Sequence, residues 1–209
     1  MIHPRRLKGT PTNLTRYYMV GDYYTKGADE HSQWGGAIAA ELGLNGKVDP
    51  STFQALLDGK VDEQKLGCRR GESKIQHHPG WDFAVNAPKS VSIMALVAGD
   101  ERVIAAHEKA VSVALSYLEE HATLRHRVDG NITHETTGRL IYARFTEHAS
   151  RELDPHLHTH VVIMNMTNRG DGTPMSSLET RAMFSEQMVA GQVYRNDLAH
   201  RLKELGYGI

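Results

Sequence analysis

Apolar residues recur at helical spacing in some parts of the chain and at every second position in others. Helical spacing is found in two consecutive segments, residues 90–97 and 100–120. Apolar and polar residues alternate in three later segments, residues 131–136, 140–147 and 156–166. The first pattern predicts two helices, of which the second is the longest in the chain, and the alternation predicts three neighbouring antiparallel strands. Helical spacing returns from Ser177 onward.

The first part of the chain contains shorter predicted elements. The alanine-rich segment 35–42 predicts a short helix, and Asp49–Pro50 predicts the start of another. Residues 81–86 alternate as a strand does, whereas residues 59–80 are polar and broken by glycine, which predicts a connecting loop. Strands flanked by groups of helices predict an α+β fold in which helices flank an antiparallel sheet.

Length and composition favour a single domain. The chain has 209 residues, of which 40% are hydrophobic, and this is enough to bury one core. We expect residues 1–13, which include Pro4, Gly9 and Pro11, to form a loose terminal segment. Residues 14–209 are then the domain.

The charge balance limits the kinds of binding partner that we expect, and the single cysteine indicates the cellular compartment. The 24 Lys and Arg residues nearly balance the 25 Asp and Glu residues, which argues against an overall basic field for nucleic acid and leaves room for a local basic groove. Cys68 is the only cysteine, which excludes an internal disulfide framework and suits the reducing cytoplasm. No apolar run approaches the roughly 18 residues of a membrane span, and no signal-peptide pattern is present.

Histidine is unusually frequent and clustered. Four of the 13 histidines fall between residues 148 and 160. Because side chains alternate across a strand, His156, His158 and His160 project from one face of the predicted strand, and His158 and His160 are close enough to share one metal ion. The alternative is a solvated strand face without a metal.

A third metal ligand is expected from the neighbouring strand. Its end offers a carboxylate in Glu147 and an imidazole in His148. Adjacent residues of a strand point to opposite faces, so only one of the two can reach the metal.

Four of the eight tyrosines form two pairs, Tyr17–Tyr18 and Tyr23–Tyr24. A tyrosine beside a metal that polarises a phosphate can act as a nucleophile, because the cation neutralises charge that develops on the non-bridging oxygens. Taken alone, clustered tyrosines are equally typical of packing against a sheet or of an interface.

Together these features resemble the conjugative relaxases of the MobF class, which are DNA strand transferases that nick a plasmid at its transfer origin. The likeness is carried by the paired tyrosines, by WDFAVNAPKSVS at residues 81–92 and by SRELDPHLHTHVVIMNMT at residues 150–167. The segments GTPMSSLE and LAHRLKELGY are also similar to the family. The resemblance extends from about residue 14 to the end, and it implies an HUH-type relaxase fold with the histidine-metal site on the central strands.

The resemblance also implies a role for each matching residue. Tyr17 corresponds to the family's first nucleophile, which forms a 5′-phosphotyrosine and leaves a free 3′-hydroxyl, and Tyr18 is the second member of the same pair. The pair Tyr23–Tyr24 corresponds to the second functional tyrosine, which allows a further strand transfer. Asp82 matches the acidic residue that orients a metal-bound histidine and helps to deprotonate the tyrosine.

One position departs from the family pattern. The family places its first metal histidine eleven residues before His158, and this chain has Glu147 there, with histidine displaced to position 148. A shift of register that brings His148 inward would turn every other side chain of the strand to the wrong face. We therefore expect Glu147, His158 and His160 to bind one divalent ion, which is Mg, Mn or Zn.

The resemblance implies single-stranded DNA at the transfer origin, with an adjacent hairpin, as the partner. Accessory relaxosome and secretion-system proteins are further implied partners, and the protein is expected to accompany the DNA into the recipient cell. Candidate residues for a basic DNA channel are Arg69, Arg70, Lys74, Lys89 and Arg151, of which we select Arg70, Lys89 and Arg151. The basic cluster Arg5, Arg6 and Lys8 falls in the predicted loose segment.

Two other functions fit parts of the pattern. A module that binds single-stranded or hairpin DNA could keep the fold and lose cleavage through Glu147. Two histidines and one carboxylate also describe the metal site of non-haem iron oxygenases, although such sites need no paired tyrosines. The chain ends within the family pattern, so we expect a relaxase domain truncated at its C-terminus, in a family where a helicase commonly follows.

Overall fold

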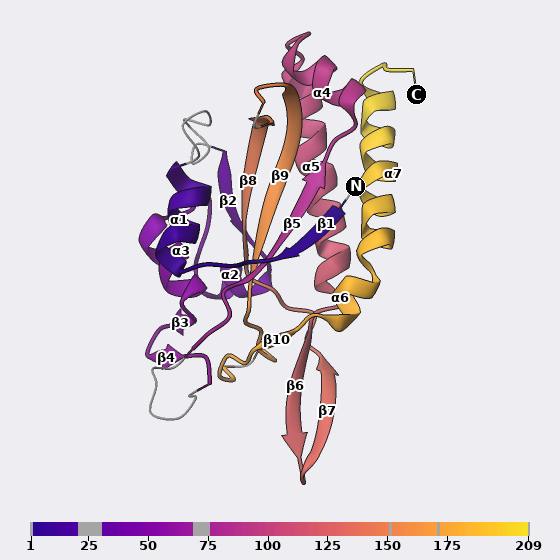
Figure 1. The fold of residues 1–209 in the computed structure, drawn as a ribbon. Coiled ribbons are helices and arrows are strands. Elements are labelled where there is room, and N and C mark those ends of the chain that lie inside the picture. The colour runs from indigo at the N-terminus through magenta and orange to yellow at the C-terminus, as the bar shows by residue number, and fades with distance from the viewer. Residues whose placement is uncertain (1, 21–30, 69–75, 151, 171, 209) are drawn as a thin grey trace.

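The computed structural model describes residues 2–20, 31–68, 76–150, 152–170 and 172–208 (Figure 1). The main sheet has five strands in the order β1-β5-β9-β8-β2, and every neighbouring pair is antiparallel. Its strands are β1 (Ile2–Arg6), β2 (Ser32–Gly35), β5 (Gly80–Asn86), β8 (Tyr142–Ala149) and β9 (Pro155–Met164). The predicted α+β fold with an antiparallel sheet is confirmed, and the histidine-rich strand β9 lies at its centre.

Helices cover both faces of this sheet (Figure 1). One face packs against α4 (Lys89–Leu96), α5 (Glu101–Glu119) and α7 (Gln187–Glu204), through a core that includes Phe83 and Val161. We call this the α5–α7 face.

The opposite face packs against shorter helical segments. Its core contains Ala143, Phe145 and Val162 and packs against the segments α1 (Pro11–Thr15), the π-helical turn η1 (Arg16–Val20), α2 (Ala37–Glu41) and α3 (Pro50–Leu57). We call this the α1–α3 face. The predicted helices at 35–42, at 50 onward, at 90–97 and at 100–120 therefore all exist as α2, α3, α4 and α5. The predicted strand at 81–86 is β5.

The N-terminal segment is more ordered than the sequence analysis expects. Residues 2–6 form the edge strand β1, which pairs with β5 over its whole length, and α1 begins after the capping residue Thr10. Ile2 is buried in the core of the α5–α7 face, which fixes the strand in place. Pro4 argues against a strand in the sequence, but an edge strand tolerates proline because one side of its backbone needs no hydrogen-bond partner.

The predicted strand at 131–136 is present but lies in a different sheet. It is β7 (Asn131–Thr136), which pairs with β6 (Thr123–Val128), and β6 in turn pairs with the short β10 (Leu178–Glu179). The β6–β7 hairpin projects from the body of the molecule (Figure 1). The expectation of three neighbouring strands is therefore wrong, because the first of them pairs with its sequence neighbour β6 and only β8 and β9 pair with each other.

Two smaller regions complete the chain. The segment 59–80, predicted as a loop, contains the two-residue strands β3 (Lys60–Val61) and β4 (Gln64–Lys65). After β10 the short α6 (Arg181–Ser185) leads into α7, as the returning helical spacing predicts. Within the part of the chain that the structure describes, no helix is long and apolar enough to cross a membrane.

Candidate active site

The register of β8 and β9 brings the three predicted metal ligands together. Glu147 lies opposite His158, and Phe145 lies opposite His160, so Glu147, His158 and His160 all project from the α1–α3 face. One ligand atom from each of the three residues lies within 4.8 Å of the others. The Glu147 Oε2 and His158 Nε2 atoms are 3.5 Å apart.

His148 lies at an irregularity on the strand. The register of β8 against β9 shifts between Glu147 and Ala149, which marks a bulge at His148. The ring of His148 packs 5.2 Å from that of His31, and its buried Nε2 has no hydrogen-bond partner among the described residues. The alternation of β8 therefore persists up to Glu147, and His148 packs against His31 instead of joining the three candidate ligands.

Both histidines are held in the orientation that metal binding needs. The Nδ1 atom of His158 is 2.9 Å from the backbone oxygen of His156, and the Nδ1 atom of His160 is 2.7 Å from Asp82 Oδ2. When each Nδ1 donates its proton to these oxygens, each Nε2 keeps a lone pair for a cation. With the carboxylate of Glu147 beside them, these residues fit a single divalent metal ion.

Asp82 connects the histidines to a tyrosine. It lies on β5, is only 5% exposed, and its Oδ2 accepts a hydrogen bond of 3.0 Å from the hydroxyl of Tyr18 as well as the bond from His160. Its second oxygen, Oδ1, is buried without a partner among the described residues. Burial lowers the pKa of His160, but the hydrogen bond to Asp82 and the charges of Asp82 and Glu147 outweigh it, so the pKa is raised.

The two tyrosines of the first pair have different surroundings. Tyr18 is 3% exposed, stacks on Phe145 and has a pKa raised well above its ordinary value by burial and by Asp82, so it remains a neutral phenol. Tyr17 is 40% exposed, and its ring meets that of Tyr18 edge-on at 4.9 Å. The π-helical turn η1 presents both residues, but only Tyr17 is open to a large ligand.

A cavity of about 400 Å³ adjoins these residues. Its lining includes Arg5, Arg6, Lys8, Tyr17, Tyr18 and Asp82. These three basic residues fall in the segment that is predicted to be loose. Instead, Arg5 and Arg6 lie on β1 and Lys8 follows its end, and all three line the same cavity as the tyrosines.

Other candidate residues lie near the start of β9 or outside the described part of the chain. The ring of His156 stacks on that of His158 at 4.5 Å, and Lys89 Nζ donates a hydrogen bond of 3.1 Å to the backbone oxygen of Pro155. Lys89 is therefore close to the start of β9. The remaining predicted site residues lie outside the described residues: Tyr23, Tyr24, Arg70 and Arg151.

A buried polar chain supports the site from the α5–α7 face. His107 on α5 is fully buried, with its Nδ1 2.7 Å from the hydroxyl of Tyr194 and its Nε2 2.9 Å from Thr159 Oγ1. Thr159 stands between His158 and His160, and its hydroxyl is 3.0 Å from that of Thr146 on β8. Burial lowers the pKa of His107 to about 3, so it is neutral. In the sequence, His107 falls among the apolar positions of the predicted helix at 100–120, and this position is the signal that indicates a buried histidine.

Comparisons with known proteins agree with this geometry. The sequence matches the TrwC relaxase family over residues 10–209. A curated relative, the multifunctional conjugation protein TraI of Escherichia coli, is 38% identical over 198 residues, which are 91% of this chain and 11% of TraI. The chain thus spans about a tenth of the length of the curated relatives it matches.

Solved structures of the family are also similar. The conjugative relaxase TrwC in complex with oriT DNA, in its metal-bound form, is 39% identical with a TM-score of 0.86, and the match covers 100% of this chain and 71% of the chain in that structure. A TrwC complex with a 27-mer DNA comprising the recognition hairpin and the cleavage site is 37% identical with a TM-score of 0.85. This match covers 100% of our chain and 70% of the chain in that structure. The chain therefore belongs to the TrwC relaxase family, as its resemblance to conjugative relaxases predicts.

Proposed function

We propose that this chain nicks one strand of plasmid DNA at a transfer origin and rejoins strands by transesterification during conjugation. The observation that carries the proposal is the joining of Tyr17–Tyr18, Asp82 and the cluster Glu147, His158 and His160 on one face of the sheet. The TrwC structures to which the chain is similar hold oriT DNA or a 27-mer DNA with the recognition hairpin and the cleavage site, and two of them hold a metal.

We assign the nucleophile to Tyr17. Its side chain is 40% exposed and lines the cavity that a phosphate can enter, whereas the hydroxyl of Tyr18 is buried, bonded to Asp82 and disfavoured as a phenolate. Attack by the Tyr17 oxygen forms a bond to phosphorus and breaks the bond from phosphorus to the 3′ oxygen. The products are a 5′-phosphotyrosine and a 3′-hydroxyl, and the reverse reaction rejoins a strand.

Asp82 is the residue we assign to the proton of Tyr17. It lines the same cavity as Tyr17, and its buried Oδ1 atom is unpartnered within the described residues. Through Oδ2 it also holds His160 and Tyr18 in place. Asp82 thereby combines proton transfer with the positioning of a metal ligand.

Glu147, His158 and His160 would hold the divalent ion, which is Mg, Mn or Zn. When bound, the ion supplies positive charge that stabilises the charge developing on the non-bridging phosphate oxygens. The carboxylate makes the ligand set harder and one unit more negative than three histidines would be. Oxygenase sites need no paired tyrosines, and the chain belongs to a relaxase family. Both facts favour strand transfer over oxygenation.

The wider setting is proposed from the family. We infer that Tyr23–Tyr24 supply a second nucleophile, that Arg70, Lys89 and Arg151 contact DNA, and that a hairpin next to the nick site is part of the ligand. Accessory relaxosome and secretion-system proteins are proposed partners. The proposed compartment is the cytoplasm of the donor cell, from which the protein accompanies the DNA into the recipient.

Two labels on one oligonucleotide test the proposal. The protein is incubated with Mn²⁺ and a single-stranded oligonucleotide from the transfer origin of the plasmid that encodes it, and the products are separated in denaturing gels. A 3′ label should migrate with the protein and a 5′ label should not, because the protein is joined to the 5′ end of the downstream fragment. Salt-sensitive binding without any denaturant-resistant adduct would instead show a DNA-binding module that does not cleave.

A further inference from the structure

The cavity beside the tyrosines carries a concentration of positive charge. Arg5, Arg6 and Lys8 line it, and all three side chains are exposed. Among the described residues, none forms a hydrogen bond or ion pair with these three side chains. Three cations that have no hydrogen-bond or ion-pair partner within the described ranges, set around a concave surface, are arranged to bind a multiply charged anion.

Strand pairing points Arg5 toward the reacting groups. Arg5 lies directly opposite Asp82 in the β1–β5 pair, so both side chains project from the α1–α3 face, as do the candidate metal ligands. In the strand order of the described residues β1 lies at the edge of the sheet, and the Arg5 side chain is exposed. Lys8 follows the end of the strand and lines the same cavity.

We propose that this cavity is a subsite for the DNA backbone, in which Arg5 binds a phosphate next to the one that Tyr17 attacks, and Arg6 and Lys8 bind the strand beyond it. The proposal rests on the proposed function, because it names where the substrate strand leaves the reacting tyrosine. Arg5 is assigned to positioning the strand, and the guanidinium can hold a phosphate through two parallel hydrogen bonds.

The charge of the site explains why such a subsite is needed. Asp82 and Glu147 place two carboxylates on the face that a phosphate must approach, and the whole chain has a formal net charge of −1. Attraction for DNA therefore has to come from local cations. The cavity supplies them within the same lining as Asp82 and the tyrosines.

A thermodynamic cycle between Arg5 and single phosphates tests the subsite. The affinity of the origin oligonucleotide is measured in a Tyr17→Phe background, where no cleavage interferes, with and without Arg5→Gln. The oligonucleotide carries a neutral methylphosphonate at one position at a time around the nick. At one flanking position, we expect each change alone to weaken binding about tenfold and both together to weaken it no further, because they remove the same contact.

Salt dependence and matched variants provide independent readouts. Arg5→Gln should reduce the slope of log affinity against log salt by about 0.7, as expected for one lost phosphate contact on a single strand. Arg5→Lys should restore much of the slope, and Lys109→Gln, an equal charge change on the exposed surface of α5, should alter neither the slope nor the cycle.

The outcomes separate this proposal from the proposed function. Losses that multiply at every flanking position, or an Arg5→Gln effect equal to that of Lys109→Gln, would overturn the subsite even if the wild-type chain forms a covalent adduct. Coupling at one position together with a wild-type chain that never forms an adduct would support the subsite and refute strand transfer.

Discussion

Glu147 determines the charge of the candidate metal site at the scale of single residues. It places a carboxylate on β8 directly opposite His158, whereas the next residue, His148, packs against His31. Alternation along β8 predicts this choice from sequence, because only one of two adjacent side chains can face the metal. The hydrogen bond between Asp82 and Tyr18 could not be predicted, since it joins residues 64 positions apart.

Metal affinity distinguishes the two neighbouring residues. Calorimetry with Mn²⁺ should show that Glu147→Ala weakens binding by more than about tenfold, because it removes a ligand and its charge. His148→Ala is the matched control and should change the affinity by less than about twofold, since its ring contacts His31. Loss of affinity in His148→Ala with normal binding by Glu147→Ala would contradict the assignment.

The pairing of β8 with β9 is the feature that matters at the scale of elements. It aligns Glu147 with His158 on one face and Thr146 with Thr159 on the other. The hydroxyl of Thr159 is hydrogen-bonded to His107, which is hydrogen-bonded to Tyr194. A buried polar chain of this kind fixes the register of two strands next to a bulge. The site therefore depends on hydrogen bonds that lie behind it.

Thr159→Val should test that dependence through stability. The substitution keeps the shape of the side chain and leaves His107 Nε2 buried without a partner, so we expect the free energy of unfolding to fall by about 1–3 kcal/mol. Urea unfolding followed by circular dichroism measures the change. The exposed Thr136 on β7 provides the control, and Thr136→Val should alter stability by less than about 0.5 kcal/mol. Equal effects of the two variants would show that the buried chain contributes nothing.

The sequence predicts some elements better than others for physical reasons. β5, β8, β9 and the helices α4 and α5 each carry their own hydrophobic period, so their ranges follow from local pattern. The β6–β7 hairpin was missed as a separate unit although Asp129–Gly130, both with positive φ, form a two-residue turn between its strands. The edge strand β1 has too few apolar residues to show a strand pattern in the sequence, and its position depends on long-range pairing with β5.

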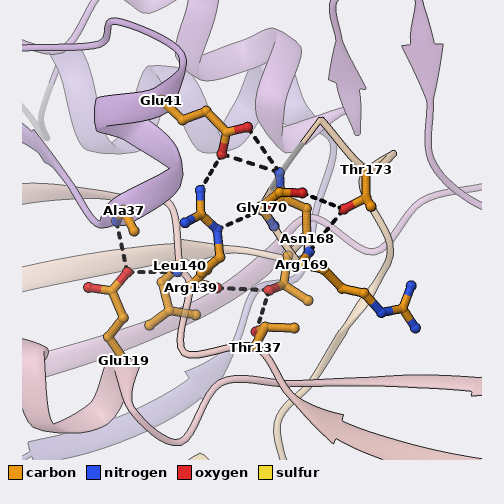
Figure 2. A network of polar contacts seen from close by, with 11 residues as sticks. Ala37, Glu41, Glu119, Thr137, Arg139, Leu140, Asn168, Arg169, Gly170 and Thr173 are labelled. Atoms are coloured by element: carbon orange, nitrogen blue, oxygen red, sulfur yellow. Dashed lines mark hydrogen bonds and ion pairs between the residues drawn. The ribbon is translucent and has the colours of Figure 1, made fainter.

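At the scale of the whole molecule, two cores on opposite faces of one sheet must be held together. Figure 2 shows a polar network that does this near the end of α5, with Arg139 and Asn168 joined to Glu41 on α2. Glu119, the last residue of α5, accepts hydrogen bonds of 2.8 Å from the backbone N–H groups of Ala37 and Leu140. One side chain thus ties α5 to the start of α2 and to the segment that enters β8.

Removing this tie should destabilise the molecule. Glu119→Ala leaves the N–H groups of Ala37 and Leu140 without their acceptor, so we expect a loss of about 1–3 kcal/mol in the free energy of unfolding. Glu119→Gln keeps an acceptor oxygen and should lose less. The neighbouring exposed Glu120 offers the control, and thermal or urea unfolding of Glu120→Ala should resemble that of the wild type. A Glu119→Ala variant as stable as Glu120→Ala would refute the role of the tie.

We assign the covalent bond to DNA to Tyr17 and not to Tyr18, whose hydroxyl is bonded to Asp82. The most direct test is mass spectrometry of peptides from the adduct formed with a single-stranded origin oligonucleotide and Mn²⁺. We predict that the nucleotide is attached to Tyr17, that Tyr17→Phe abolishes this adduct, and that Tyr18→Phe still forms it at Tyr17. A nucleotide found on Tyr18 in the wild-type chain, or an undiminished adduct in Tyr17→Phe, would contradict the account.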